Sequence, residues 1–187
     1  MKTLKRLMIF AFILIFSTSI FADYKAATPE QVAKLTICAC ALSRNIQEMD
    51  GIDIYVMGNR KIANALQKYN GQQIGKVEIK SIKFGNTLPR TKPTVLVCGY
   101  NSHTSSVRDY CRKNNVLSIG ARPIACNRGL SLSMCREVND ENDQSLSQVK
   151  VILNLEASFY EEIFWNKNIA YVSERIIPRD LYVSTKR

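Results

Sequence analysis

The sequence predicts an α/β fold in three layers: a mixed sheet of about six strands, helices on both faces, and a β-hairpin near the C-terminal end. Three observations support this class. Short apolar segments alternate with helical patterns along most of the chain. One region has the strand, helix, strand order of a βαβ unit. Two later segments of alternating polarity flank a polar loop, as the strands of a hairpin do.

The first 22 residues have the organisation of a secretory signal peptide. The basic segment MKTLKR precedes ten uninterrupted apolar residues, LMIFAFILIF, and a small-residue site ends at Ala22. The alternative is a membrane anchor, but a span needs about 20 apolar residues and this run stops at Ser17. We therefore predict cleavage after Ala22, export to a bacterial periplasm, and a single domain over residues 23–187.

Size and charge limit the partners of this domain. Cleavage would leave 165 of the 187 residues, enough for one domain whose core folds unaided. The leader carries three basic residues and no acid, so the mature chain keeps +7 of the formal charge of +10. The basic residues are spread along the chain and form no block of the kind that binds nucleic acid. We therefore expect no nucleic-acid partner.

The N-terminal part of the domain predicts two helices and two strands. The segment TPEQVAKLTICACALSRNI begins with Thr28 and Pro29, which are typical of a helix start. Its apolar residues recur at helical spacing and predict one buried stripe: Val32, Leu35, Cys38 or Ala39, and Leu42. The segment IDIYVMG predicts a strand. Asn59 can cap a second helix that Gly71 stops, and GKVEIKSIKF alternates as a partly exposed strand does.

The C-terminal part predicts the βαβ unit and the hairpin. The segment TVLVCGYNSHTSSVRDYCRKNNVLSIGA contains an apolar strand, a helix and a second apolar strand, which implies a parallel pair. LSLSMCREV and QVKVILNLEA alternate in polarity and are separated by the polar loop NDENDQSLS, so they predict a hairpin. ASFYEEIFWNKN and YVSERIIP predict one or two closing helices.

The best candidate ligand loop contains Gly99, Asn101 and Ser102. It lies in GYNSHTSS, where a strand opens into a helix N-terminus with unpaired backbone N–H groups. The segment has neither a GxGxxG nor a GKS pattern. An ordinary helix cap by Ser102 or Thr104 is therefore the competing interpretation.

The sequence contains no recognisable catalytic set. His103 is the single histidine, and no GxSxG motif accompanies it. Glu161 and Glu162 are adjacent, and neighbouring helical residues diverge by about 100°, so they are poorly placed to flank one bond. With one histidine and no CxxC pattern, we expect no metal site. A binding protein without a cofactor is favoured over an enzyme.

All six cysteines lie in the predicted mature chain, where an oxidising compartment favours disulfides. Cys126 and Cys135 end the ten-residue stretch CNRGLSLSMC, in which Gly129 marks a turn. We predict a local bridge between these two cysteines. Pairing of either one with Cys98 or Cys111 is the alternative.

The order of these segments resembles the YfiR family of small periplasmic proteins over roughly residues 29 to 178. The resemblance is carried by the first helix, IDIYVMGNRKIANALQ, TVLVCG and VLSIGA. It continues through the Cys-x-x-Gly ending at Gly129, the Asn154-Leu155 pair and a late pair of isoleucines. Two departures are present. RNIQEMDG replaces an aromatic and a Trp-Pro of the family, and the cysteines of a common family disulfide, in the first strand and before the middle strand, are absent.

The resemblance implies a regulator without enzymatic activity. Such proteins are similar to a periplasmic repressor that binds the sensor domain of an inner-membrane diguanylate cyclase and lowers cyclic-di-GMP synthesis, and with it biofilm formation. An outer-membrane lipoprotein relieves that repression, and the resemblance also implies a homodimer. The alternative function is a periplasmic small-ligand-binding protein that uses the strand-end loop around Gly99 to Ser102.

Overall fold

The computed structural model describes residues 24–100, 104–137 and 149–179. The strands are β1 (Tyr24–Ala26), β2 (Ile52–Met57), β3 (Gln73–Ile74), β4 (Val77–Gly85), β5 (Val95–Cys98), β6 (Leu117–Gly120), β7 (Leu132–Glu137), β8 (Val149–Asn154) and β9 (Arg175–Ile177). The helices are α2 (Pro29–Leu42), the 3-10 turn η1 (Ile46–Glu48), α3 (Arg60–Gln67), α4 (Thr104–Asn114), α5 (Ile124–Asn127), α6 (Leu155–Tyr160) and α7 (Ile169–Val172).

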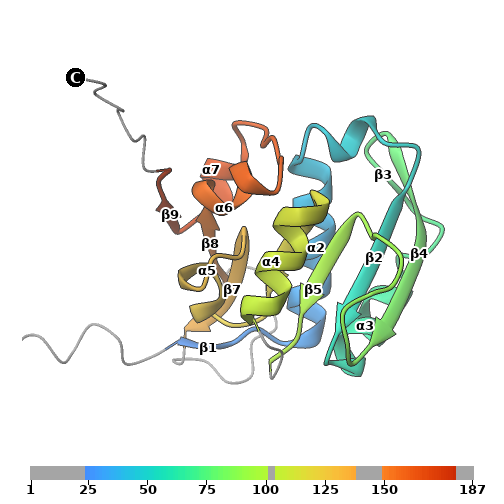
Figure 1. The fold of residues 1–187 in the computed structure, drawn as a ribbon, viewed down its shortest axis with the longest axis horizontal. Coiled ribbons are helices and arrows are strands. Elements are labelled where there is room, and N and C mark those ends of the chain that lie inside the picture. Colours follow the sequence, from blue (N-terminus) through green and yellow to red (C-terminus); the bar gives the residue numbers. More distant parts are fainter. Residues whose placement is uncertain (1–23, 101–103, 138–148, 180–187) are drawn as a thin grey trace, which may run out of the picture.

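The strands form one mixed sheet of nine members in the order β3-β4-β2-β5-β6-β7-β8-β9, with β1 paired to β7 outside this path. The pairs from β4 through β2, β5 and β6 to β7 are parallel, and β7 and β8 are antiparallel. This confirms the predicted α/β class with helices on both faces (Figure 1). Nine strands replace the expected six because β1, β3 and β9 have three, two and three residues, too few for a periodic pattern.

The βαβ unit and the hairpin are both present. β5 and β6 pair in parallel across α4, with Val95 beside Leu117. β7 and β8 pair in antiparallel register, with Leu132 opposite Leu153, and the polar loop between them lies outside the described residues. The sequence pattern was sufficient here because each strand is four to six residues long and apolar on its buried side.

The C-terminal end differs from the prediction. The segment YVSERIIP was expected to be helical, but α7 ends at Val172 and Arg175–Ile177 form β9, parallel to β8. Ile176 and Ile177 are β-branched, which favours a strand that can pair with β8. The single turn α5 was not predicted either, because four residues carry no helical period.

Two apolar cores lie on opposite faces of the sheet. α2 and α3 pack on the first face through Val32, Ile37, Ile62 and Leu66, which contribute to the larger core. α4 and α5 pack on the second face in a smaller core. Figure 1 shows α4 in front of the sheet and α2 behind it.

The predicted buried stripe of α2 is only partly correct. Val32 and Ala39 are buried in the first core, and so are Ala33, Ile37 and Cys40. By contrast Leu35 and Leu42 are half-buried and Cys38 is exposed. The helix therefore packs a broader face against the sheet than the predicted stripe. Leu35, Cys38 and Leu42, at one edge of the stripe, are not fully covered by any element among the described residues.

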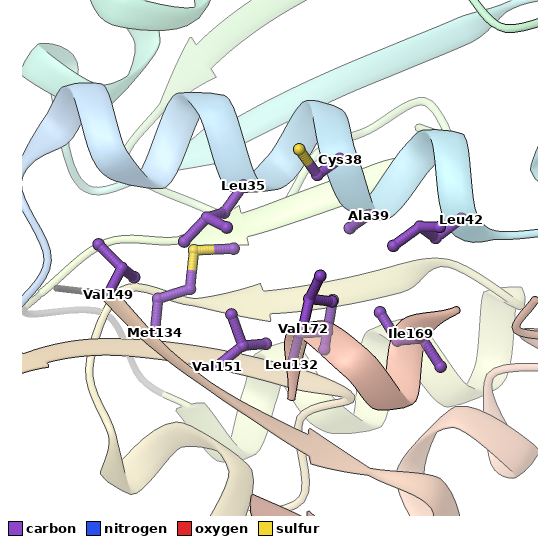
Figure 2. A pocket seen from close by; sticks show the side chains of 10 residues that line it. All are labelled: Leu35, Cys38, Ala39, Leu42, Leu132, Met134, Val149, Val151, Ile169 and Val172. Atoms are coloured by element: carbon purple, nitrogen blue, oxygen red, sulfur yellow. The ribbon is translucent and has the colours of Figure 1, made fainter. Parts of the chain in front are cut away.

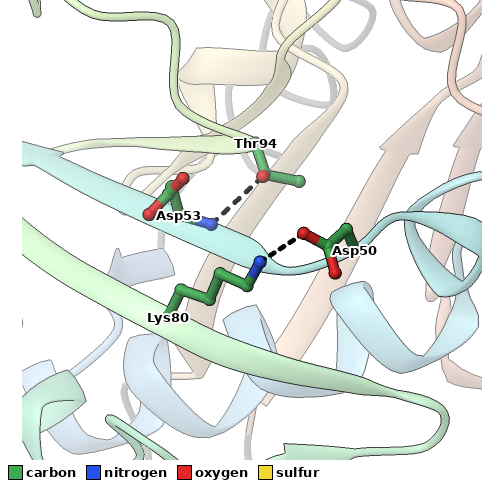
Figure 3. Close-up of polar contacts among 4 residues, drawn as sticks. All are labelled: Asp50, Asp53, Lys80 and Thr94. Atoms are coloured by element: carbon green, nitrogen blue, oxygen red, sulfur yellow. Dashed lines mark hydrogen bonds and ion pairs between the residues drawn. The ribbon is translucent and has the colours of Figure 1, made fainter.

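The start of β2 is fixed by polar contacts to both neighbouring strands (Figure 3). The Asp53 amide donates to Thr94 Oγ1 at 3.1 Å, and the Thr94 amide donates to the Asp53 carbonyl oxygen at 2.8 Å. Asp50 and Lys80 form an ion pair of 2.5 Å, in which both side chains are largely exposed, so its contribution to stability is small.

Candidate functional site

Of the three predicted ligand-loop residues, the structure describes only Gly99. The Gly99 amide donates to the Met57 carbonyl oxygen at 2.8 Å, and a Cβ at this position would lie 2.8 Å from the same oxygen and from Asn59 Cβ. Packing of β5 against the end of β2 therefore accounts for this glycine. Asn101, Ser102 and His103 lie outside the described residues, and their role as a ligand loop stays a prediction.

The residues of the family-like motif have structural roles. Asn154 Oδ1 accepts from the Ala157 amide and caps α6, while its Nδ2 donates to the Cys126 carbonyl oxygen, both at 2.9 Å. Gly129 ends α5 with a φ of +87°, and a Cβ there would lie 2.8 Å from Arg108 Cδ. Leu155 is the first residue of α6 and lies at the surface. These residues join α5, β8 and α6.

The two cysteines of the predicted bridge lie on neighbouring elements. Cys126 is buried in α5, and its Sγ donates to the Ile152 carbonyl oxygen in β8 at 3.1 Å. Cys135 lies in β7 opposite Lys150 of β8, and its side chain lies outside the described residues. The disulfide between them therefore stays a prediction.

We expect peptides from unreduced periplasmic protein to contain Cys126 linked to Cys135. Replacement Cys135→Ser should then lower the free energy of unfolding by roughly 2–3 kcal/mol, because it opens a short cross-linked loop. Mass spectrometry and thermal denaturation measure the two effects. Cys38→Ser, at an exposed cysteine, is the control and should leave the melting midpoint unchanged. Rapid alkylation of Cys126 or Cys135 in unreduced native protein would contradict the bridge.

The replacement Asn154→Ala should lower the free energy of unfolding by about 2 kcal/mol, because it removes a helix cap and leaves a buried carbonyl without its donor. Urea denaturation measures this loss. Asn168→Ala is the matched control, since Asn168 precedes α7 without a side-chain capping bond and is exposed. Equal losses in the two variants would show that Asn154 has no special role.

A buried polar cluster on the second face was not predicted from the sequence. Glu161 follows α6 and is fully buried. Its carboxylate accepts from the Ser118 amide at 2.9 Å, from the Ser118 hydroxyl, and from the Ser131 hydroxyl at 2.5 Å. The Ser131 amide donates to Ser118 Oγ at 2.9 Å. The cluster thus links β6, the residue before β7 and the end of α6. The only sign of it in the sequence is that Ser118 and Ser131 stand within apolar segments.

Burial dominates the electrostatics of this cluster. It raises the pKa of Glu161 from 4.5 to about 7, although the serine hydrogen bonds and the Arg112 charge act in the opposite direction. The Arg112 guanidinium carbon lies 4.7 Å from the centre of the Tyr160 ring, and its Nε is buried without a hydrogen-bond partner. Glu161, Ser118 and Ser131 are all fully buried, so their hydrogen bonds hold β6, the start of β7 and the end of α6 together.

The raised pKa predicts how stability depends on pH. Below pH 4.5 the carboxyl is protonated in both states, and between 4.5 and about 7 unfolding releases its proton. The free energy of unfolding should therefore fall as the pH rises through this window, by about 3 kcal/mol in total, and this contribution should stay lost above it. Urea denaturation at a series of pH values measures the slope.

Glu161→Gln should remove this part of the slope, because the side chain can no longer ionise. Glu162→Gln is the control: Glu162 is exposed and accepts from Asn115 Nδ2 at 2.7 Å. An unchanged slope in Glu161→Gln would mean that the Glu161 carboxyl has the same pKa in the folded and the unfolded protein.

An apolar pocket of about 300 Å³ lies where the α2 stripe is uncovered. Figure 2 shows α2 on one side of it and the β7–β8 hairpin and α7 on the other. Its walls are Leu35, Cys38, Ala39, Leu42, Leu132, Met134, Val149, Val151, Ile169 and Val172. Among the described residues no charged side chain lines it, and the partly desolvated surroundings raise the pKa of the Cys38 thiol, which is therefore neutral at pH 7.

Exposed apolar side chains are frequent in the segment from α6 to β9. We call them the C-terminal apolar surface: Leu155, Phe159, Tyr160, Phe164, Tyr171, Val172 and Ile176. Tyr171 is 86% exposed and Phe164 60%. Trp165 differs from them, because it is buried and its Nε1 donates to Ser158 Oγ at 2.9 Å. Val172 belongs both to this surface and to the pocket.

In the described part of the chain, no cluster of three or more histidine, cysteine or acidic side chains could hold a metal ion. Within the same residues no helix has the length and apolar character needed to cross a membrane. The predicted signal peptide lies outside the described residues.

The mixed sheet with helices on both of its faces makes this chain a mixed α/β domain. Its fold is similar to a crystal structure of a conserved domain protein from Vibrio cholerae O1 biovar eltor str. N16961, with a TM-score of 0.54 at 12% identity. The similarity covers 78% of this chain and 60% of that one, and at this identity it shows the fold alone. The chain matches no family model and no curated protein.

Proposed function

We propose that the chain is an exported, non-enzymatic regulatory protein that represses an inner-membrane diguanylate cyclase by binding its periplasmic sensor domain. The observation that carries this proposal is the C-terminal apolar surface. Soluble domains bury most of their large apolar side chains, and a segment that exposes several of them supports a protein-binding role. The resemblance to the YfiR family supplies the class of partner.

The composition of the surface suits a protein partner. Phe159 and Tyr160 contact each other edge to face, with ring centres 5.7 Å apart, and aromatic side chains of this kind are enriched in interfaces. The Arg179 guanidinium lies 3.3 Å from the centre of the Phe159 ring. Lys167, just before α7, and Arg175, at the start of β9, are also exposed. A partner with apolar side chains and an acidic border would fit it best.

The regulatory cycle follows from the resemblance. An outer-membrane lipoprotein that competes for the repressor would release the cyclase and raise cyclic-di-GMP, and with it biofilm formation. A homodimer would present two copies of the C-terminal apolar surface to a dimeric sensor. Export to the periplasm through the predicted signal peptide brings the repressor to both partners.

The double variant Phe164→Ala, Tyr171→Ala should weaken binding to the sensor domain at least about tenfold, because exposed aromatics are frequent anchors of an interface. The partner to use is a membrane diguanylate cyclase with a periplasmic domain encoded beside this gene. Titration of purified sensor domain measures affinity, and cyclic-di-GMP in cells measures repression.

The matched control is Ile124→Ala, which removes an exposed apolar side chain from α5, on the second face of the sheet. It should bind and repress as the wild type does. Absence of binding by the wild-type protein would overturn the choice of partner. Wild-type affinity in the double variant would overturn the choice of surface.

A second candidate function is small-ligand binding, and the observation that favours it is the apolar pocket beside α2. The strand-end loop around Gly99 to Ser102 is less favoured, because packing against β2 explains Gly99. The two functions are compatible, since the pocket and the C-terminal apolar surface share Val172.

A further inference from the structure

We propose that the pocket between α2 and the β7–β8 hairpin binds a free medium-chain fatty acid, with the hydrocarbon inside and the carboxylate beside Lys34. The inference rests on the second candidate function, small-ligand binding, and it can fail without affecting the proposed regulatory function because its test uses the isolated protein. Four elements supply its walls, and its floor is made of buried side chains, among them Leu132, Met134 and Val151.

The volume of the pocket sets the size of the ligand. Apolar cavities of about 150 Å³ already bind benzene, and this pocket has about 300 Å³. A methylene group occupies about as much space as a water molecule, roughly 30 Å³, so a chain of about ten carbons would fill it. The volume also lies at the lower end of the range for small-molecule sites.

The chemistry of the walls selects an apolar body. The lining residues have aliphatic side chains apart from the thioether of Met134 and the thiol of Cys38. A sugar, nucleotide or free amino acid would lose hydrogen bonds to water inside such a pocket without replacement. An alkyl chain loses none, and each buried methylene contributes about a fourfold gain in affinity.

The rim of the pocket selects an anionic head. Lys34 and Cys38 are four residues apart on α2, so they lie one turn apart on the same face of the helix. Both are exposed, and Cys38 also lines the pocket (Figure 2). A ligand that enters beside Cys38 can therefore place a carboxylate near the Lys34 ammonium while its chain lies between α2 and the hairpin.

The first experiment uses decanoate and protein purified from the periplasm. Calorimetry below the micellar concentration should detect one decanoate per chain, bound more than about tenfold more tightly than hexanoate because four methylenes are lost. Bound decanoate should also slow alkylation of Cys38, identified by peptide mass spectrometry. Absence of decanoate binding, or unchanged Cys38 alkylation at saturation, would overturn the proposal.

Variants then locate the site. Cys38→Phe should fill the pocket and weaken decanoate binding more than about tenfold, whereas Ala41→Phe adds the same group at an exposed position of α2 outside the pocket and should not. Val172→Phe fills the pocket from α7 and replaces Cys38→Phe if that variant unfolds by circular dichroism. Wild-type affinity in a folded filling variant would overturn the proposal.

The charge of the head group is tested separately. Lys34→Gln should weaken decanoate binding about two- to fivefold and leave binding of neutral decanol unchanged, because a surface ion pair contributes modestly. Equal effects on both ligands would remove the role of Lys34. If the ligand-free protein sediments as a dimer in which Cys38 resists alkylation, the pocket is a contact between two copies and the fatty-acid proposal fails.

Discussion

The width of the sheet determines what the helices on its first face can cover. Eight strands follow one another in the main path, and at about 4.8 Å between neighbours the outer strands lie about 34 Å apart. Two helices packed side by side cover about 20 Å of that width, since each has a diameter of about 10 Å. α2 and α3 pack over the parallel strands, and the short segment around α7 packs over the hairpin. The pocket lies between α2 and α7, where these two parts of the helical layer meet.

The same constraint explains why one side of α2 is less buried than its sequence suggests. Leu35 and Leu42 have the spacing of core residues, and they do face apolar strands, but no side chain among the described residues fills the space opposite them. Spacing along a helix indicates which residues share a face. It carries no information on whether the opposing layer is wide enough to meet that face, because the opposing layer is formed by strands a hundred residues later.

Local patterns therefore predicted the elements better than the site. The βαβ unit, the hairpin and the cap at Thr28 depend on neighbouring residues, and all three are present. β9 and α5 were missed because they are too short to carry a period. The Glu161 cluster joins residues 118, 131 and 161, and its partners could not be recognised from a serine or a glutamate alone. Of the family-like motif, Asn154 and Gly129 lie where α5, β8 and α6 meet.

The two ends of the sheet are poor templates for another strand. β3 has two residues and β9 has three, so each offers few backbone groups for pairing with a second chain. β3 covers Val77 and Glu78 of the longer β4, and the rest of β4 carries the exposed charges of Lys80 and Lys83. Lysines on an outer strand oppose the flat stacking from which fibrils grow. Copies of this domain should therefore resist edge-to-edge aggregation at high protein concentrations.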